Sequence, residues 1–503
     1  MRDPSNQPTA TAAFKPAIRL LVLSLSFTLF APQTALNAAD RPNIIVILCD
    51  DLGYGDLECY GHPHIKTPNL NKLADSGIRL TNCYSAAPVC SPSRVGLLTG
   101  RSPNRAGVYD WIPPGGATPR KDAREQVHMR KNEVTIAHLL RSAGYATCMS
   151  GKWHCNSRFN SSAQPQPGDA GFDHWFGTQN NASPSHENPD NYVRNGSEVG
   201  ELEGFSCQLA ANEAMGWVEN HHAKSPEQPF FVYLAFHEPH EPVASPPALV
   251  SEYSEVAEDE DEAQYFANVA NVDRAVGNVI GSLERLELRD DTLVFFSSDN
   301  GPETLKRYSR ANRSWGRATP LRGMKLWTTD AGFRVAGMLS WPGSIKSGQV
   351  SDTVFSSLDL LPTFCAIAQI PSAERVPAER LDGIDASSFL AGSKLERTKP
   401  LLWCYYNAIN ERRVAMRWGK WKMLARLDGN QPKLSNVHDG NRKQVFGRDL
   451  SNFQLYDVAE DISESNDLFA TAAEAESLRI QMEQSYAALL ADSHVWTRAQ
   501  PAE

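Results

Sequence analysis

Several stretches of this sequence are unbroken runs of apolar residues that end abruptly in polar ones. Residues 43–49 read Asn-Ile-Ile-Val-Ile-Leu-Cys, similar runs occupy 230–236 and 292–297, and a shorter run lies at 145–149. A strand with one solvated face alternates apolar and polar side chains, whereas these runs do not alternate. They therefore predict strands buried on both faces, which are typical of a mostly parallel sheet covered by helices.

Segments with helical features lie between these runs. Residues 67–77 begin with Thr-Pro, a common helix start, and residues 135–142 and 263–286 also have helical patterns. Strands that alternate with helices predict an α/β fold with a doubly wound, mostly parallel central sheet and helices on both faces.

Toward the C-terminus the pattern changes. Residues 413–424 read as two short strands around a Trp-Gly-Lys turn, 454–458 as a further strand, and 472–490 as an amphipathic helix. We therefore expect a large domain over 40–390, followed by a smaller domain over 391–503 with an antiparallel sheet and a closing helix.

The first 39 residues have the features of a signal peptide. Lys15 and Arg19 precede an apolar run over 20–31, and Ala38 and Ala39 offer small residues for cleavage. The run is short for a bilayer span, so an exported protein is expected, periplasmic or secreted and without stable membrane insertion after cleavage, and an uncleaved anchor is the alternative.

Net charge and cysteine spacing argue against a nucleic-acid partner and against a zinc site. The formal net charge of −10 argues against nucleic acid, although a local basic pocket can exist on an acidic surface. The nine cysteines contain no Cys-x-x-Cys pair, so a zinc site is not expected. An odd number in an exported chain leaves at least one cysteine unpaired.

Polar residues follow four of the apolar runs at the point where each predicted strand ends. Asp50 and Asp51 follow the first run, and the others lead into 151–154, 237–240 and 298–301. Ligand sites in open α/β sheets form at the carboxyl ends of strands, so these four ends can converge on one crevice. Any one of them alone would be an ordinary capped turn.

Carboxylate and carboxamide oxygens dominate two of these ends. Asp50, Asp51, Asp299 and Asn300 offer hard oxygen ligands and no thiolate or imidazole, which suits Ca²⁺ or Mg²⁺. Three acids placed together would repel one another unless a cation lay among them. We therefore predict a cation site, with capping and turn roles as the alternative.

A further segment, Cys90-Ser91-Pro92-Ser93-Arg94, predicts the start of a helix. Ser91 is a suitable N-cap and Pro92 suits the first helical position, which places Cys90 at the positive end of the helix dipole. Arg94, about one turn further on, adds a fixed positive charge. A half-buried cysteine before an ordinary helix is the simpler interpretation of the motif in isolation.

This segment, with Leu-Thr-Gly-Arg at 98–101, resembles the signature of type I sulfatases of the alkaline phosphatase superfamily. In that family the cysteine is oxidised after synthesis to Cα-formylglycine by a maturation enzyme. Residues 50–56 and 298–301 resemble the two metal motifs of the family. The resemblance implies a Ca²⁺ held by Asp50, Asp51, Asp299 and Asn300 together with the modified Cys90.

Three further segments are similar to family motifs: Gly-Lys-Trp-His at 151–154, Pro-His at 239–240 and Leu-Arg-Gly-x-Lys at 321–325. By this resemblance Lys152 and Lys325 contact the sulfate. His154 holds or deprotonates the formylglycine hydroxyl, and His240 binds sulfate and is a candidate acid for the leaving group. The sequence departs from the family at 326–335, which leaves the local loop shape open.

The resemblance also implies a mechanism. One hydroxyl of the hydrated aldehyde at residue 90, polarised by the cation, Arg94 and Lys152, attacks sulfur in line. His240 or Lys325 protonates the leaving alcohol, and His154 acts as base when the aldehyde re-forms and sulfate is expelled.

Two alternatives remain for the function. A phosphate or phosphonate ester hydrolase of the same superfamily can carry a similar cysteine motif, and a non-catalytic glycan- or cation-binding protein could retain the fold. Residues 172–196 resemble exported sulfatases similar to arylsulfatase A and to N-acetylgalactosamine-6-sulfatase. The resemblance therefore implies a sulfated carbohydrate as the substrate.

Overall fold

A computed structural model describes residues 41–115, 123–304, 311–430, 434 and 436–498. All of these residues belong to one compact unit. The predicted signal peptide over 1–39 lies outside the described residues. Within them, no helix is long and apolar enough to cross a membrane.

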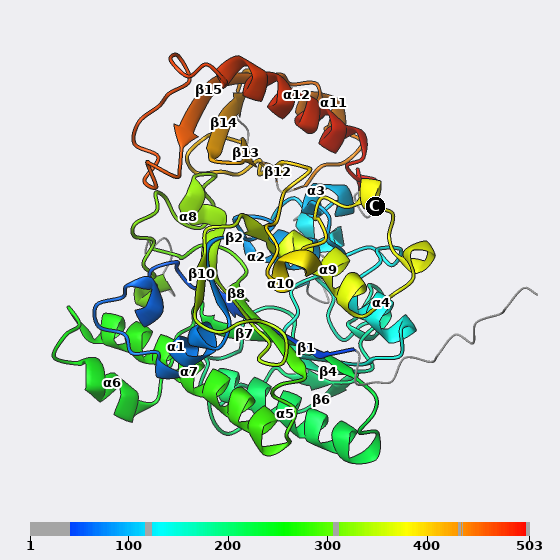
Figure 1. The fold of residues 1–503 in the computed structure, drawn as a ribbon, viewed down its shortest axis with the longest axis vertical. Coiled ribbons are helices and arrows are strands. Elements are labelled where there is room, and N and C mark those ends of the chain that lie inside the picture. Colours follow the sequence, from blue (N-terminus) through cyan, green and yellow to red (C-terminus); the bar gives the residue numbers. More distant parts are fainter. Residues whose placement is uncertain (1–40, 116–122, 305–310, 431–433, 435, 499–503) are drawn as a thin grey trace, which may run out of the picture. The chain divides into compact units, whose positions relative to one another are not determined.

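A large mixed sheet forms the centre of the molecule (Figure 1). Its central strands β8, β1, β7, β3 and β4 run parallel to one another, and antiparallel neighbours flank this block on both sides. The path of the sheet is β10 (Gln349–Ser351), β2 (Ile78–Tyr84), β9 (Arg334–Ser340), β8 (Thr292–Ser298), β1 (Asn43–Asp50), β7 (Phe230–Pro239), β3 (Ala146–Lys152), β4 (His174–Thr178), β5 (Val193–Arg194) and β6 (Ser197–Glu198), with β11 (Phe355–Ser356) beside β2.

Strand β1 shows why the apolar runs do not alternate. Ile44 and Val46 pack into one hydrophobic layer, whereas Ile45 and Ile47 pack into the layer on the opposite face of the sheet. Successive side chains of a strand point to opposite faces, so a strand covered on both sides needs an apolar residue at every position.

Helices supply both of these layers (Figure 1). Residues of α5 and α7 pack with Ile45 and Ile47, and residues of α2, α4 and α9 pack with Ile44 and Val46. The helices are α1 (Pro68–Asp75), α2 (Cys90–Thr99), α3 (Pro103–Ala106), α4 (Ile136–Ser142), α5 (Ser206–Lys224), α6 (Pro247–Tyr253), α7 (Glu260–Arg285), α8 (Asp330–Phe333), α9 (Leu360–Ile367), α10 (Ser387–Leu390), α11 (Arg442–Phe446) and α12 (Ala475–Ala491).

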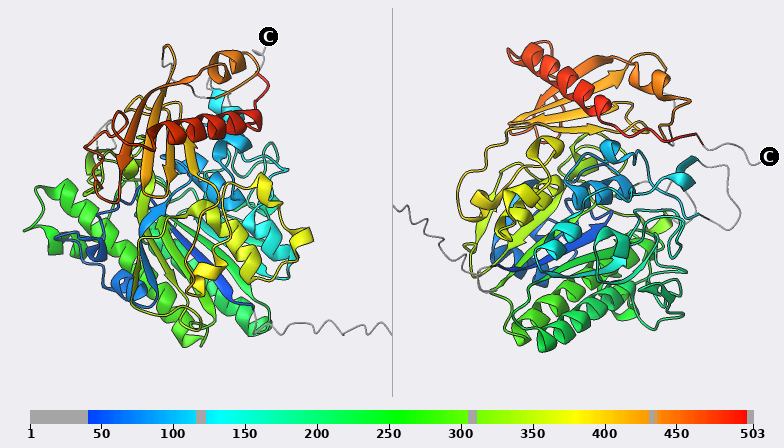
Figure 2. Two further views of the ribbon diagram at one scale, coloured as in Figure 1. Left: turned by 45° about the horizontal axis from the view of Figure 1, so that its top comes forward. Right: turned by 90° about the vertical axis from the view of Figure 1, so that its right-hand side faces the viewer.

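A separate antiparallel sheet follows toward the C-terminus. Its strands are β12 (Leu401–Cys404), β13 (Val414–Trp418), β14 (Trp421–Leu427) and β15 (Leu450–Asp457) in that order, and α12 lies across one of its faces (Figure 2). The predicted fold class is therefore confirmed. The exact division of the chain into 40–390 and 391–503 stays a prediction.

The start of α2 differs from the sequence analysis in one detail. The N-cap is Val89 in extended conformation, and Cys90 is itself the first helical residue, so the predicted Ser91 cap is wrong. The Ser91 hydroxyl instead accepts a hydrogen bond from the Ile112 backbone N–H at 3.0 Å. Every residue of α2 is buried, because the helix lies inside the molecule rather than on its surface.

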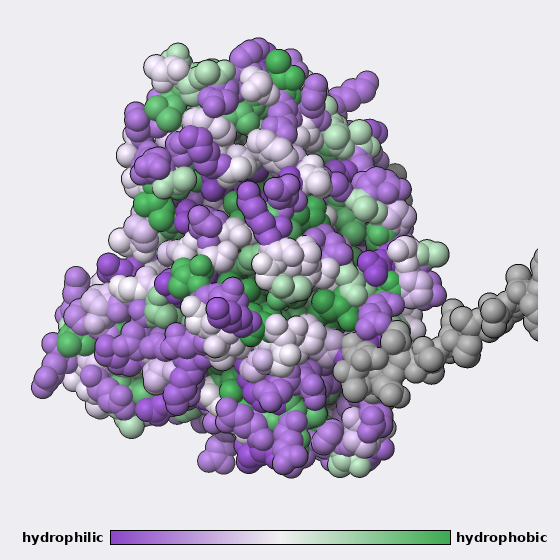
Figure 3. Space-filling view, viewed as in Figure 1, coloured by the Kyte–Doolittle hydropathy of each residue, from purple (hydrophilic) through white to green (hydrophobic). Residues whose placement is uncertain are grey.

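The cysteines and the surface add two observations. All nine cysteines are free thiols. On the face shown in Figure 3, hydrophilic residues predominate and hydrophobic ones lie in small separate groups.

Candidate active site

The structure brings the polar ends of four strands together. In the order β8, β1, β7 and β3 these strands are neighbours, and β7 and β8 both run parallel to β1, as β3 does to β7. Their carboxyl ends consequently lie at one edge of the sheet. Asp299 follows β8, Asp50 ends β1, His240 follows β7 and Lys152 ends β3.

Arg94 reaches into this edge from the first turn of α2. Its Nε donates to Asp299 Oδ2 at 2.9 Å, and its Nη1 donates to the Lys152 carbonyl at 3.0 Å. Its Nη2 lies 2.8 Å from Asp299 Oδ2 and 3.6 Å from Asp50 Oδ1. The guanidinium therefore ties the helix to three of the strand ends.

Two lysines and a histidine surround the carboxylates. Lys152 Nζ contacts Asp50 Oδ2, and Lys325 Nζ donates to Asp51 Oδ2 at 2.6 Å. His240 Nε2 lies 3.5 Å from Asp51 Oδ2. Basic side chains and carboxylates thus alternate in one buried cluster at the ends of the strands.

Burial and neighbouring charge set the ionisation of the acids. Burial alone would raise the pKa of Asp50, but Lys152, His240 and Arg94 hold it well below its usual value. Burial raises the pKa of Asp299 to about 7, and the charge of Asp50 contributes to that rise. Asp50 and Asp299 therefore repel each other across the site.

The donor set at these strand ends fits a hard cation. Asp50 Oδ1 and Asn300 Oδ1 are buried and accept no hydrogen bond from the described residues. Asp50, Asp299 and Cys90 each present a ligand atom, and these atoms lie within 4.8 Å of one another. Asp51 is joined to the group by Asn300, whose Nδ2 donates to Asp51 Oδ1 at 2.7 Å. Carboxylate and carboxamide oxygens are ligands that Ca²⁺ prefers.

Cys90 lies at the buried end of the crevice. The residue is 3% exposed at the N-terminus of α2. Burial raises the pKa of the thiol to about 12, and Lys152 and Lys325 oppose the rise only in part. The unmodified thiol is consequently protonated at neutral pH and is a poor nucleophile.

His154 is oriented by unusual local backbone. It has a φ of 53°, and the preceding Gly151 has a φ of 102° and lies so close to the Ala235 carbonyl that a Cβ would be 1.9 Å from that oxygen. His154 Nε2 pairs with the Ile112 carbonyl at 2.9 Å, which assigns the proton to Nε2. Burial, Lys152 and Arg94 hold the pKa of His154 well below its usual value. The buried Nδ1 has no hydrogen-bond partner in the described structure and is left as a proton acceptor.

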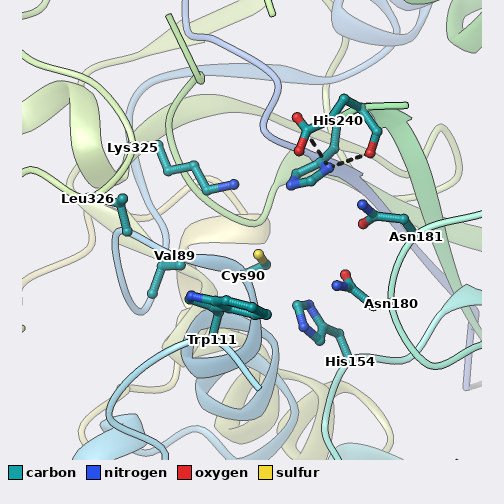
Figure 4. Close-up of a pocket in the computed structure, with 10 residues that line it drawn as sticks. Val89, Cys90, Trp111, His154, Asn180, Asn181, His240, Lys325 and Leu326 are labelled. Atoms are coloured by element: carbon teal, nitrogen blue, oxygen red, sulfur yellow. Dashed lines mark hydrogen bonds and ion pairs between the residues drawn. The ribbon is translucent and has the colours of Figure 1, made fainter. Parts of the chain in front are cut away.

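A cavity of about 450 Å³ opens onto these groups (Figure 4). Cys90, His154, His240 and Lys325 line it, and the ring of His240 and the ammonium of Lys325 point toward each other across it. The other lining residues were not found by the sequence analysis: Val89, Trp111, Asn180, Asn181, Glu241 and Leu326. The signal for Asn180 and Asn181 was the end of β4, a fifth strand end at the same edge.

His237, by contrast, does not line the cavity. It is buried, and its Nε2 pairs with the Thr178 hydroxyl at 2.8 Å and its Nδ1 with the Tyr192 hydroxyl at 3.3 Å. These hydrogen bonds indicate a structural role for His237.

The chain is similar to known proteins over most of its length. The family model described as Sulfatase matches residues 42–370. The chain is 35% identical to arylsulfatase A from Homo sapiens, over 78% of this chain and 76% of that protein. It is 33% identical to N-acetylgalactosamine-6-sulfatase from Rattus norvegicus, over 81% of this chain and 75% of that protein. Among solved structures, Ps i-CgsB in complex with k-i-k-neocarrahexaose aligns with a TM-score of 0.73 and 27% identity, over 91% of this chain and 95% of that chain.

Proposed function

The chain belongs to the sulfatase family, and on this premise we propose that it hydrolyses the sulfate ester of a carbohydrate with a formylglycine made from Cys90 and a bound Ca²⁺. The observation that carries the proposal is the position of Cys90. It lines the cavity as the first residue of α2, with Lys325 in the same lining, and its sulfur lies within 4.8 Å of carboxylate oxygens of Asp50 and Asp299.

The chemistry of Cys90 requires a modification. A protonated thiol beside hard oxygen ligands is a poor partner for Ca²⁺, whereas the hydrated aldehyde of formylglycine offers hydroxyl oxygens. The proposal therefore includes a maturation enzyme that oxidises Cys90.

Asp50, Asp51, Asp299, Asn300 and the modified Cys90 would hold the cation. Bound there, Ca²⁺ would polarise the nucleophilic oxygen and neutralise charge on the sulfate. The Asp50 and Asn300 oxygens that accept no hydrogen bond support this assignment.

The remaining residues bind sulfate and move protons. Arg94 fixes the orientation of the carboxylates and of α2. Lys325 lines the cavity, and the buried Lys152 contacts the neighbouring Asp50; their ammonium groups would stabilise charge on the sulfuryl oxygens as it develops.

His240 and His154 take opposite roles. His240 lines the cavity next to Lys325 and donates a proton to the leaving alcohol, while the unprotonated Nδ1 of His154 accepts one from the hydroxyl of residue 90. Their positions on opposite sides of the cavity keep the two proton transfers apart (Figure 4).

A carbohydrate substrate is supported by the relatives. The similar solved structure Ps i-CgsB was determined with k-i-k-neocarrahexaose, and a curated relative is an N-acetylgalactosamine-6-sulfatase. The features of residues 1–39 support export, to the periplasm or the medium.

The experiment compares mature wild-type protein with Cys90→Ala and the control Cys59→Ala, a half-buried cysteine away from the cavity. Release of sulfate from 4-nitrophenyl sulfate and from sulfated monosaccharides is measured. We expect C90A to lose turnover while remaining folded, and C59A to retain turnover. Appreciable sulfatase activity in C90A, or faster hydrolysis of 4-nitrophenyl phosphate by the wild type, would contradict the proposal.

A further inference from the structure

The cavity has two chemically different walls. Val89, Trp111 and Leu326 form an apolar side, and Asn180 and Asn181 lie across from Leu326 and Val89 on a polar side (Figure 4). A pyranose ring has the same division, because its C–H groups form apolar faces and its hydroxyls lie around the edge. At about 450 Å³, the cavity lies within the usual size of small-molecule sites, about 300–1,000 Å³.

Trp111 is the large aromatic side chain on the apolar wall, and its backbone is anchored by Asp110. The Trp111 N–H donates to Asp110 Oδ1 at 2.9 Å. The buried Asp110 carboxylate also accepts from the Tyr405 hydroxyl at 3.0 Å and from Asn407 Nδ2 at 2.9 Å. Tyr405 and Asn407 come from the loop between β12 and β13, so the small C-terminal sheet helps to place this wall.

Arg124 fixes the indole ring itself. Its guanidinium carbon lies 4.3 Å from the centre of the Trp111 ring, and Arg124 Nη1 pairs with Asp110 Oδ2 at 3.4 Å. Trp111 lines the cavity but Arg124 does not. The part of the indole that faces the cavity is therefore not covered by Arg124. These contacts fix the Trp111 indole beside Cys90. Because the indole is already ordered, binding of a ligand to it loses little conformational entropy.

We propose that Trp111 is a substrate-binding residue whose indole packs against the apolar face of the sulfated sugar ring, with Leu326 extending that surface. The inference rests on the proposed function and deepens it, since it assigns the ring-binding part of the same cavity. Asn180 and Asn181 then face the hydroxyl-bearing edge of the ring.

The test separates ring binding from sulfate binding. Trp111→Ala and Trp111→Phe are compared with wild type on galactose, N-acetylgalactosamine and N-acetylglucosamine monosulfates as substrates, and inorganic sulfate serves as a competitive inhibitor that has no ring. For the best of these substrates we expect KM to rise about tenfold in W111A and less in W111F, with the Ki of inorganic sulfate unchanged.

A matched control is Trp217→Ala on α5, whose indole stacks on His221 away from the cavity and which should leave both constants unchanged. An equal rise of KM and Ki in W111A, or no change in KM, would overturn the role of Trp111 while leaving the proposed function standing. If mature wild-type protein released sulfate from none of these sugars, the proposed carbohydrate function would fail, and this inference with it.

Discussion

Arg94 Nη2 and Asp299 Oδ2 lie 2.8 Å apart, although 205 residues separate them in the chain. Both side chains are fully buried. The pair joins the helix that begins with Cys90 to the end of β8, and the Arg94 contact with the Lys152 carbonyl adds the end of β3. This one guanidinium thus links the helix that begins with Cys90 to the carboxylates at the strand ends.

Replacing Arg94 by Lys keeps the charge but removes the planar fork that reaches Asp299 and the Lys152 carbonyl together. We expect kcat/KM for 4-nitrophenyl sulfate to fall by about 10²-fold or more. Replacing it by Met leaves the buried Asp299 carboxylate without its cationic partner, and urea unfolding in the presence of a chelator should show a loss of about 3–5 kcal/mol. Arg274→Met is the control, because the Arg274–Glu252 pair is exposed. A stable and active R94M protein would contradict this account of Arg94.

Removal of Ca²⁺ tests the oxygen ligand set. A chelator should lower both activity and Tm, and added Ca²⁺ should restore both, because a ligand that binds only the folded state stabilises it by mass action. In Asn300→Ala, which lacks one unpaired oxygen, a higher Ca²⁺ concentration should be needed to restore Tm. A Tm that did not respond to chelator or to Ca²⁺ in the wild type would argue against a resident calcium ion.

Lys422 and Lys420 offer a matched pair for the role of buried charge. Lys422 on β14 is fully buried, and its Nζ lies 2.7 Å from Asp330 Oδ1 and 3.7 Å from Glu464 Oε1, whereas Lys420 pairs with Asp457 at the surface. We expect Lys422→Met to lower the free energy of unfolding by about 3–5 kcal/mol.

Lys420→Met should leave the urea midpoint unchanged. Asp330, the partner of Lys422, begins α8 and lies five residues after Lys325, which lines the cavity. Loss of the Lys422 contact should therefore disturb the position of Lys325, so that K422M also raises KM. Equal midpoints for K420M and K422M would contradict the structural role of the buried lysine.

His62 predicts a pH dependence of stability. Burial, Arg317 and His64 lower its pKa from 6.5 to about 4, and its Nδ1 accepts backbone hydrogen bonds from His64 and Ile65, so the folded state requires a neutral ring. The unfolded state takes up a proton first as the pH falls. The stabilising contribution is therefore complete above about pH 6.5 and is lost progressively toward pH 4.

The substitution His62→Asn keeps an acceptor and does not titrate in this range. Urea midpoints measured from pH 7.5 to 4.5 should consequently fall less for H62N than for wild type. Parallel curves for the two proteins would contradict the assignment.

The sequence predicted the strand ends well because the physical signal was strong. A strand covered on both faces must be apolar throughout, so β1, β7 and β8 were found with nearly correct bounds. Helix α7 begins at Glu260 rather than at the expected 263. Asp259 caps the helix, and the acidic residues in its first turn interact favourably with the positive end of the helix dipole. Such local electrostatics are weaker than the apolar pattern and are easily missed.

The apolar wall of the cavity could not be predicted. Trp111 and Leu326 lie in irregular segments, and their positions depend on contacts with the loop between β12 and β13, where the Ile409 N–H donates to the Leu326 carbonyl at 2.9 Å. Leu326 also has a φ of 66°, which no sequence pattern indicates for a leucine. Contacts between residues this far apart in the chain set the wall.

The most direct measurement is the mass of the peptide that contains Cys90, from protein produced in its native host. Conversion of the thiol to the aldehyde of formylglycine should lower the mass by about 18 Da relative to the unmodified peptide. The predicted result is this loss at Cys90, with the peptides that contain Cys59 and Cys365 unmodified. An intact thiol at Cys90 in protein that hydrolyses sulfate esters would contradict the central claim.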